Sequence, residues 1–150
     1  MRIRNRGAFF GRLALATVLS AGAAACDSST EPDHDHDEAV GLVVLDHATE
    51  ETLVTVNSSR QVTGSLSVQA GQERSIEVWF VGEDGDRFVP EGDHSLGIAI
   101  ADPSRASIHM HGDHGHFEGL LAGSTTVVFS IVHGSHSDYD SPAIPITVTP

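Results

Sequence analysis

Four histidines flank a Gly112–Asp113 step, and imidazoles at this spacing are suited to holding a metal ion. Gly and Asp tolerate the positive φ angles of tight turns, so residues 107–118 are predicted to form two strands joined by a two-residue hairpin turn. Directly opposed residues, and residues two apart on one strand, share a face of the sheet. This register places four candidate ligands on one face: His109, His111, His114 and His116.

The same register sends the apolar residues of the hairpin to the other face, where we expect Ile108, Met110, Gly115 and Phe117. A slip of one residue would mix the two sets, so the pattern favours this register. Opposed Cβ atoms lie about 5 Å apart, and imidazole nitrogen binds zinc at about 2.0–2.1 Å. Three or four rings are therefore expected to reach one ion. The alternative is a solvated polar face that happens to contain histidine.

A second polar segment, at 133–141, contributes His133, His136 and Asp138 as candidate ligands. They either complete the hairpin's site or form a second one; the alternative is a polar loop that caps the fold. Strands that alternate in direction place every second connection at the same end. Three connections are thus predicted to meet at one end: the hairpin turn, the segment 133–141, and the connection 82–92 with the adjacent His94. We assign His94 to secondary metal capture. His47, on an early turn, is expected to lie apart as surface decoration.

The charge distribution is strongly acidic after the first residues of the chain. All eight basic residues are Arg, and four of them lie within the first 12 positions. From Cys26 onward, four Arg and 21 acidic residues leave a net charge of 4 − 21 = −17 with His neutral. Such a surface repels nucleic acid and anionic lipid headgroups and concentrates cations, so nucleic acid is excluded as an expected partner. The single Cys excludes an intrachain disulfide.

Residues 1–25 are typical of an export signal, with an Arg-rich start, a short apolar run and small residues before Cys26. The apolar run is too short to span a bilayer. The segment Ala23-Ala24-Ala25-Cys26 resembles the lipobox of bacterial lipoproteins, although the commonest form has Leu in place of Ala23. The resemblance implies cleavage before Cys26, lipidation of its thiol and anchoring to a membrane of the cell envelope, at a periplasmic or outer surface. The alternative is an ordinary secretory signal that leaves a free Cys.

Residues 26–39 are predicted to be a lipidated, disordered tether. From position 27 to position 38 the only apolar residue is Pro32, so this stretch cannot pack into a core. His34 and His36 alternate with Asp in a short tract of a kind that often binds metal, and we assign them to secondary metal capture. The alternative is a solvated spacer that lifts the folded domain off the membrane, and the two roles are compatible.

Residues 40–150 are predicted to form one all-β domain. Short β-rich runs are separated by Gly, Asp, Asn and Pro turn signals, and no stretch shows a convincing helical period. Runs at this spacing indicate a β-sandwich. The expected strands lie at 40–45, 52–56, 66–69, 75–81, 96–101, 107–118 (the hairpin), 125–132 and 144–149.

Four segments of this domain, at 70–85, 104–108, 119–128 and 144–149, resemble bacterial immunoglobulin-like domains, most specifically in the Ala-Gly-Ser-Thr-Thr run that begins at Ala122. The resemblance implies an immunoglobulin-like β-sandwich of about 7–9 short antiparallel strands. It also implies a place in extracellular adhesins or envelope proteins, with no catalytic residues to carry over. The His-rich hairpin departs from that family, so the family does not predict the metal.

Neutral imidazole and carboxylate suit divalent zinc, copper or nickel. Zinc is preferred because a strand His-x-His with a third imidazole is close to a tetrahedral set, and copper(II) or nickel is possible. An exposed hairpin lacks the shaped, dry pocket of an enzyme, so no enzymatic activity is expected. The sequence favours an envelope lipoprotein that buffers, senses or hands over metal, with a metal transporter or another envelope protein as partner. The alternative is a metal-free spacer or adhesion module, with an interface near Trp79.

Overall fold

The computed structural model describes residues 38–150. The predictions for the export signal at 1–25, for lipidation of Cys26, for a tether and for metal capture by His34 and His36 lie outside the described residues. Among residues 38–150 the structure contains no helix that could span a bilayer.

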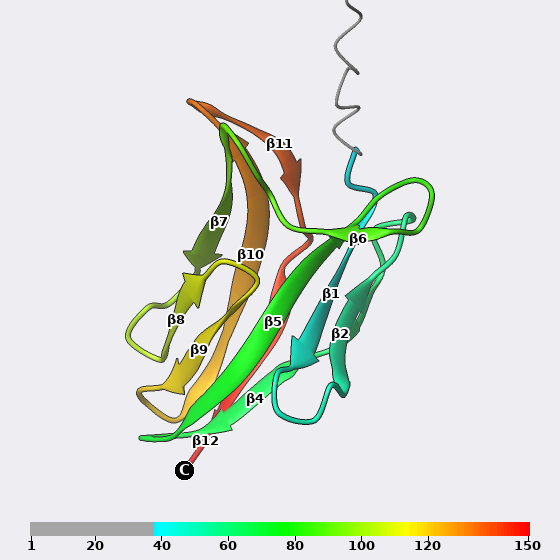
Figure 1. The fold of residues 1–150 in the computed structure, drawn as a ribbon. Coiled ribbons are helices and arrows are strands. Elements are labelled where there is room, and N and C mark those ends of the chain that lie inside the picture. Colours follow the sequence, from blue (N-terminus) through cyan, green and yellow to red (C-terminus); the bar gives the residue numbers. More distant parts are fainter. Residues whose placement is uncertain (1–37) are drawn as a thin grey trace, which may run out of the picture. The chain divides into compact units, whose positions relative to one another are not determined.

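The described chain is an all-β sandwich of two sheets (Figure 1). The seven-stranded sheet has the order β3-β2-β1-β5-β9-β8, with β6 beside the end of β5. Its strands are β1 (Gly41–Asp46), β2 (Thr52–Val56), β3 (Val62–Gly64), β5 (Glu73–Val81), β6 (Arg87–Phe88), β8 (Ala106–His111) and β9 (His114–Gly119).

The five-stranded sheet is built around the long strand β10, which pairs with β7 along one side. Along the other side β12 pairs with the first half of β10 and β11 pairs with the second half. The edge strand β4 pairs with β12 in parallel. The strands are β4 (Leu66–Gln69), β7 (His94–Ile100), β10 (Gly123–His133), β11 (His136–Asp140) and β12 (Ile144–Thr149).

Alternating side chains of the two sheets form a single apolar core. The strand β5 buries every second residue, and its Ile76, Val78 and Phe80 are 0–1% exposed. From the facing sheet, Phe129 of β10 and Ile146 of β12 are equally buried. Since side chains alternate along a strand, the intervening residues are left for the outer faces, and the hairpin histidines lie on that of the seven-stranded sheet.

Most predicted strands are present, and three of them, at 52–56, 66–69 and 144–149, coincide with observed strands. The expected number of about 7–9 strands was too low, because β3, β6 and β11 were missed. The first two are short strands of two or three residues. In β11 only Tyr139 is buried, so this strand carries no alternating apolar signal.

The predicted hairpin register is confirmed. His109 opposes His116 and His111 opposes His114 across β8 and β9. Ile108, Gly115 and Phe117 are buried on the opposite face. Gly115 is required there, because a Cβ atom at this position would lie 2.2 Å from the carbonyl oxygen of His109.

The prediction that three connections meet at one end is correct for two of them and wrong for the hairpin. Asp93, at the end of the connection that follows β6, contacts His133 at the end of β10. The hairpin turn instead lies halfway along β5, where the amide of Val78 donates to the carbonyl oxygen of Asp113 over 2.9 Å. The reason is length: β9 pairs only with the first five residues of β5, Glu73 to Glu77, and so stops short of that end.

Candidate metal centre

Three histidines form one row across neighbouring strands at the end of the five-stranded sheet. His133, the last residue of β10, is paired with His94 of β7 on one side and with His136 of β11 on the other. The ring centroids of His94 and His133 lie 4.6 Å apart, and those of His133 and His136 lie 5.1 Å apart. Directly paired residues share a face, so the register itself gathers the three imidazoles.

Two carboxylates connect these rings. Asp138 lies two residues after His136 on β11; its Oδ2 lies 3.0 Å from Nε2 of His94 and its Oδ1 3.1 Å from Nε2 of His136. Asp93 connects His94 with His133: its Oδ1 lies 3.0 Å from Nδ1 of His94, and its Oδ2 lies 2.9 Å from Nε2 of His133. We call these five residues the end cluster.

The cluster combines a shielded centre with an open rim. The side chain of His94 is only 14% exposed, whereas that of His136 is 62% exposed. The pKa of Asp93 is held below its usual range by its own backbone N–H and by the adjacent His133 and His94. Asp93 is therefore ionised near neutral pH, which favours a cation at this position.

One ligand atom each from His94, His133 and Asp138 can be chosen so that all three lie within 4.8 Å of one another. Two ligands about 2.0–2.2 Å from a tetrahedral zinc ion are separated by roughly 3.3–3.6 Å. The observed 3.0 Å between Nε2 of His94 and Oδ2 of Asp138 is close to that spacing. Two imidazoles and a carboxylate are a donor set that divalent zinc accepts, and His136 or Asp93 can supply a further ligand.

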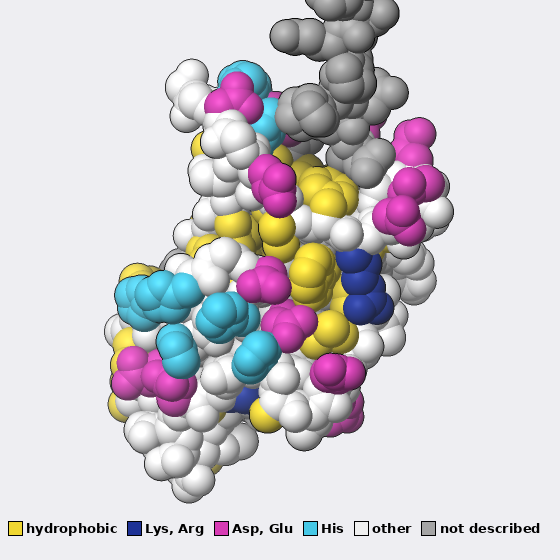
Figure 2. Space-filling model, viewed as in Figure 1, with side chains coloured by type: hydrophobic (Ala, Val, Ile, Leu, Met, Phe, Trp, Pro, Cys, Tyr) yellow, Lys and Arg dark blue, Asp and Glu magenta, His cyan; other side chains and the backbone are white. Residues whose placement is uncertain are grey.

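The hairpin histidines form a second, separate group on the outer face of the seven-stranded sheet, as Figure 2 shows. The rings of His111 and His116 approach to 6.0 Å, and His114 stacks on His47 instead, with ring centroids 5.2 Å apart. Among residues 38–150 the convergent ligand set is at the end cluster, so the four hairpin rings do not gather around one point in this structure.

The sequence-predicted residues thus fall into two places. His133, His136 and Asp138 are brought together with His94, to which the sequence assigns only a secondary role and which is the most shielded of the three histidines. His109, His111, His114 and His116 lie elsewhere. The structure also corrects the expectation that His47 lies apart, since it stacks on His114. In the sequence, only its adjacency to His94 indicates that Asp93 belongs to the end cluster. No local sequence pattern indicates that His47 lies beside His114.

Comparisons with known proteins give no family for this chain. No protein-family model matches it, and no curated protein matches it. Among solved structures, domains 4 and 5 of the S-layer protein SbsC are similar at 18% identity, with a TM-score of 0.43 over 59% of this chain and 49% of that one. Domains 5–6 of the same protein match at 17% identity, with a TM-score of 0.42 over 58% of this chain and 40% of that one. The chain therefore spans less than half the length of these matched structures.

Proposed function

We propose that this protein binds a divalent transition metal, with zinc preferred, through the end cluster. The observation that carries the proposal is the convergence of His94, His133 and Asp138 from three strands onto one point. Neutral imidazole and carboxylate are ligands for zinc, copper(II) and nickel, and a near-tetrahedral set of nitrogen and oxygen favours zinc.

The role we propose is capture and release rather than catalysis. A catalytic zinc site needs an open coordination position inside a shaped, water-excluding pocket. The rim of the end cluster is exposed, with the side chains of His133 and His136 40% and 62% accessible. An exposed site within an acidic chain gains cations from solution and exchanges them readily, which suits a buffer, a sensor or a metal chaperone.

We further propose that the protein acts in the cell envelope. The support is the export signal at 1–25 and the lipobox-like segment that ends at Cys26, which imply a lipid anchor at a periplasmic or outer surface. A metal transporter or another envelope protein is the partner that this role requires. The resemblance to bacterial immunoglobulin-like domains agrees with the same location.

The proposal is tested by titrating the full-length, metal-free protein with zinc against a chromophoric chelator. His94→Gln and His133→Gln each remove one convergent ligand, and we expect each to weaken the tightest binding step at least about tenfold. Asp84→Asn, in the exposed turn after β5, is the control for an unrelated polar change. Affinities for zinc that are equal in the wild type and in both histidine variants would overturn the proposal.

A further inference from the structure

The outer face of the seven-stranded sheet carries two cross-strand rows of histidine. In one row, Glu77 of β5 pairs with His114 of β9, which pairs with His111 of β8. In the neighbouring row, Ser75 pairs with His116, which pairs with His109. The turn after β1 extends the second row, because the amide of His47 donates to the carbonyl oxygen of Ser75 over 3.0 Å. Five imidazoles therefore share one face of the sheet.

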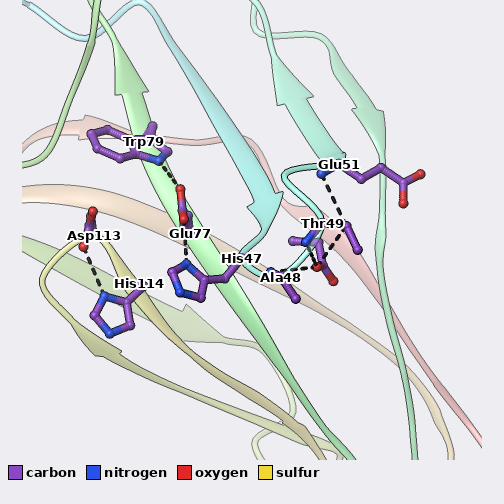
Figure 3. A network of polar contacts seen from close by, with 9 residues as sticks. His47, Ala48, Thr49, Glu51, Glu77, Trp79, Asp113 and His114 are labelled. Atoms are coloured by element: carbon purple, nitrogen blue, oxygen red, sulfur yellow. Dashed lines mark hydrogen bonds and ion pairs between the residues drawn. The ribbon is translucent and has the colours of Figure 1, made fainter.

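Three of these rings have one nitrogen engaged by a carboxylate. Nδ1 of His47 lies 2.6 Å from Oε1 of Glu77, and Nδ1 of His114 lies 3.2 Å from Oδ1 of Asp113 (Figure 3). Nδ1 of His116 lies 2.8 Å from Oε1 of Glu73. An ionised carboxylate only accepts, so His47 and His114 donate their Nδ1–H and keep the lone pair of Nε2. His116 and Glu73 lie at an ion-pair distance without the geometry of a hydrogen bond. This carboxylate–imidazole pairing is the usual support of a metal-ligating histidine.

The Glu77 carboxylate is held on both sides. Trp79 donates its Nε1–H to Oε2 of Glu77 over 2.9 Å, while Oε1 of the same carboxylate faces His47. Glu77 and Asp113 therefore place fixed carboxylate groups beside the imidazoles that they hold.

The two central rings are already adjacent. His47 and His114 stack with an interplanar angle of 21°, although His47 follows β1 and His114 lies on β9, two strands that pair with opposite sides of β5. Ser75, which has a short side chain, lies between His47 and His116 in their row. The side chains of His47 and His114 are 49% and 47% exposed, so each can turn its Nε2 toward a shared ion without displacing the core.

We propose that His47, His114 and His116 form a second divalent-metal site, ligated by Nε2 atoms and supported by Glu77, Asp113 and Glu73. By the usual order of affinity for divalent metals, copper(II) binds these imidazole nitrogens more tightly than zinc or nickel does. The site shares no residue with the end cluster and does not depend on it. Its ligand set differs from the predicted hairpin site by including His47, and it leaves His109 and His111 at the edge.

The only tryptophan of the chain provides a local readout, because Trp79 is hydrogen-bonded to the same Glu77 that holds His47 (Figure 3). Tryptophan fluorescence of the full-length protein is titrated with copper(II) chloride in the wild type and in His47→Gln, His114→Gln and His136→Gln. We expect saturable quenching in the wild type. The midpoint should rise at least about tenfold in the first two variants and stay unchanged in His136→Gln, the matched substitution in the end cluster.

Curves for His47→Gln and His114→Gln that overlay the wild type would overturn the second site, even if the end cluster binds metal. If a variant unfolds, zinc titration of the ¹⁵N-labelled wild type decides instead. The ring nitrogen signals of His47 and His114 must then move together as zinc is added. Signals of these two rings that do not change, while those of His94 and His133 do, would equally overturn the proposal and leave the end cluster intact.

Discussion

Nε2 of His94 and Oδ2 of Asp138 lie 3.0 Å apart, although the whole width of β10 separates the strands that carry them. Their meeting point is above His133, whose ring lies 4.6 Å from that of His94. An imidazole and a carboxylate reach this distance either by sharing a proton or by sharing a metal ion. The relationship therefore links the metal affinity of the end cluster to the ionisation of its own residues.

Replacing the Asp138 carboxylate should separate its role as a metal ligand from its contribution to the overall negative charge. In Asp138→Asn the side chain keeps its size but loses the anionic ligand, so we expect zinc affinity to fall at least about tenfold, with little change in the fold. The measurement is competition with a chromophoric chelator, together with a thermal unfolding curve. Asp84→Asn removes the same charge from the exposed turn after β5, outside the end cluster, and should leave the affinity unchanged. Equal losses in both variants would show that only overall charge matters.

A buried turn carboxylate should make the domain sensitive to acid. Asp46 accepts hydrogen bonds from the amides of Ala48 and Thr49, and its Oδ2 lies 2.7 Å from Nε of Arg74. The hydrogen bond from Arg74 is the main cause that lowers the pKa of Asp46 to about 2 from 3.8.

The Asp46 carboxyl group binds a proton more weakly in the folded state than in the unfolded state. Its contribution to the free energy of unfolding is therefore complete above about pH 4 and is lost as the pH falls toward 2. The shift corresponds to about 2 kcal/mol. Urea unfolding of the wild type and Asp46→Asn should differ by about that amount at pH 6, and the difference should shrink toward pH 2. A difference that stays constant over this range would contradict the assignment.

The hairpin that carries His109 to His116 should depend on one glycine. A Cβ atom at position 115 would lie 2.2 Å from the carbonyl oxygen of His109 and 2.6 Å from Sδ of Met110. Gly115→Ala therefore forces β8 away from β9, and we expect a loss of about 1–3 kcal/mol in the free energy of unfolding. Amide hydrogen exchange should speed up in β8, while the central strand β10 serves as the internal reference. Unchanged protection of the β8 amides would contradict this prediction.

A buried hydroxyl beside the end cluster should be dispensable. The Oη atom of Tyr139 is buried without a hydrogen-bond partner among the described residues, and its ring packs edge-on against Phe80 at 5.6 Å. Burial raises the pKa of Tyr139. Tyr139→Phe keeps the ring contact and removes an unsatisfied polar group, so we expect unchanged or higher thermal stability and unchanged zinc affinity. A loss of more than about 1 kcal/mol would indicate a partner for this hydroxyl.

Local alternation in the sequence determined the hairpin, its register and the face on which its histidines lie. A strand has a period of two, so the separation of His109 and His111 from Ile108 can be read without knowing the rest of the fold. The same reasoning located the main core strands and the all-β class. It missed β11, because a strand with one buried residue carries no alternation to detect.

Only the tertiary structure decided which of these side chains meet. His94, His133 and Asp138 converge because β7 and β11 pair with opposite sides of β10, and His47 reaches His114 because β1 and β9 pair with opposite sides of β5. Such neighbours are set by the pairing of strands that are distant along the chain, and residues near each site do not encode that pairing. Strand length acted in the same way. β9 begins at His114 opposite Glu77, partway along β5, and this keeps the two histidine groups apart.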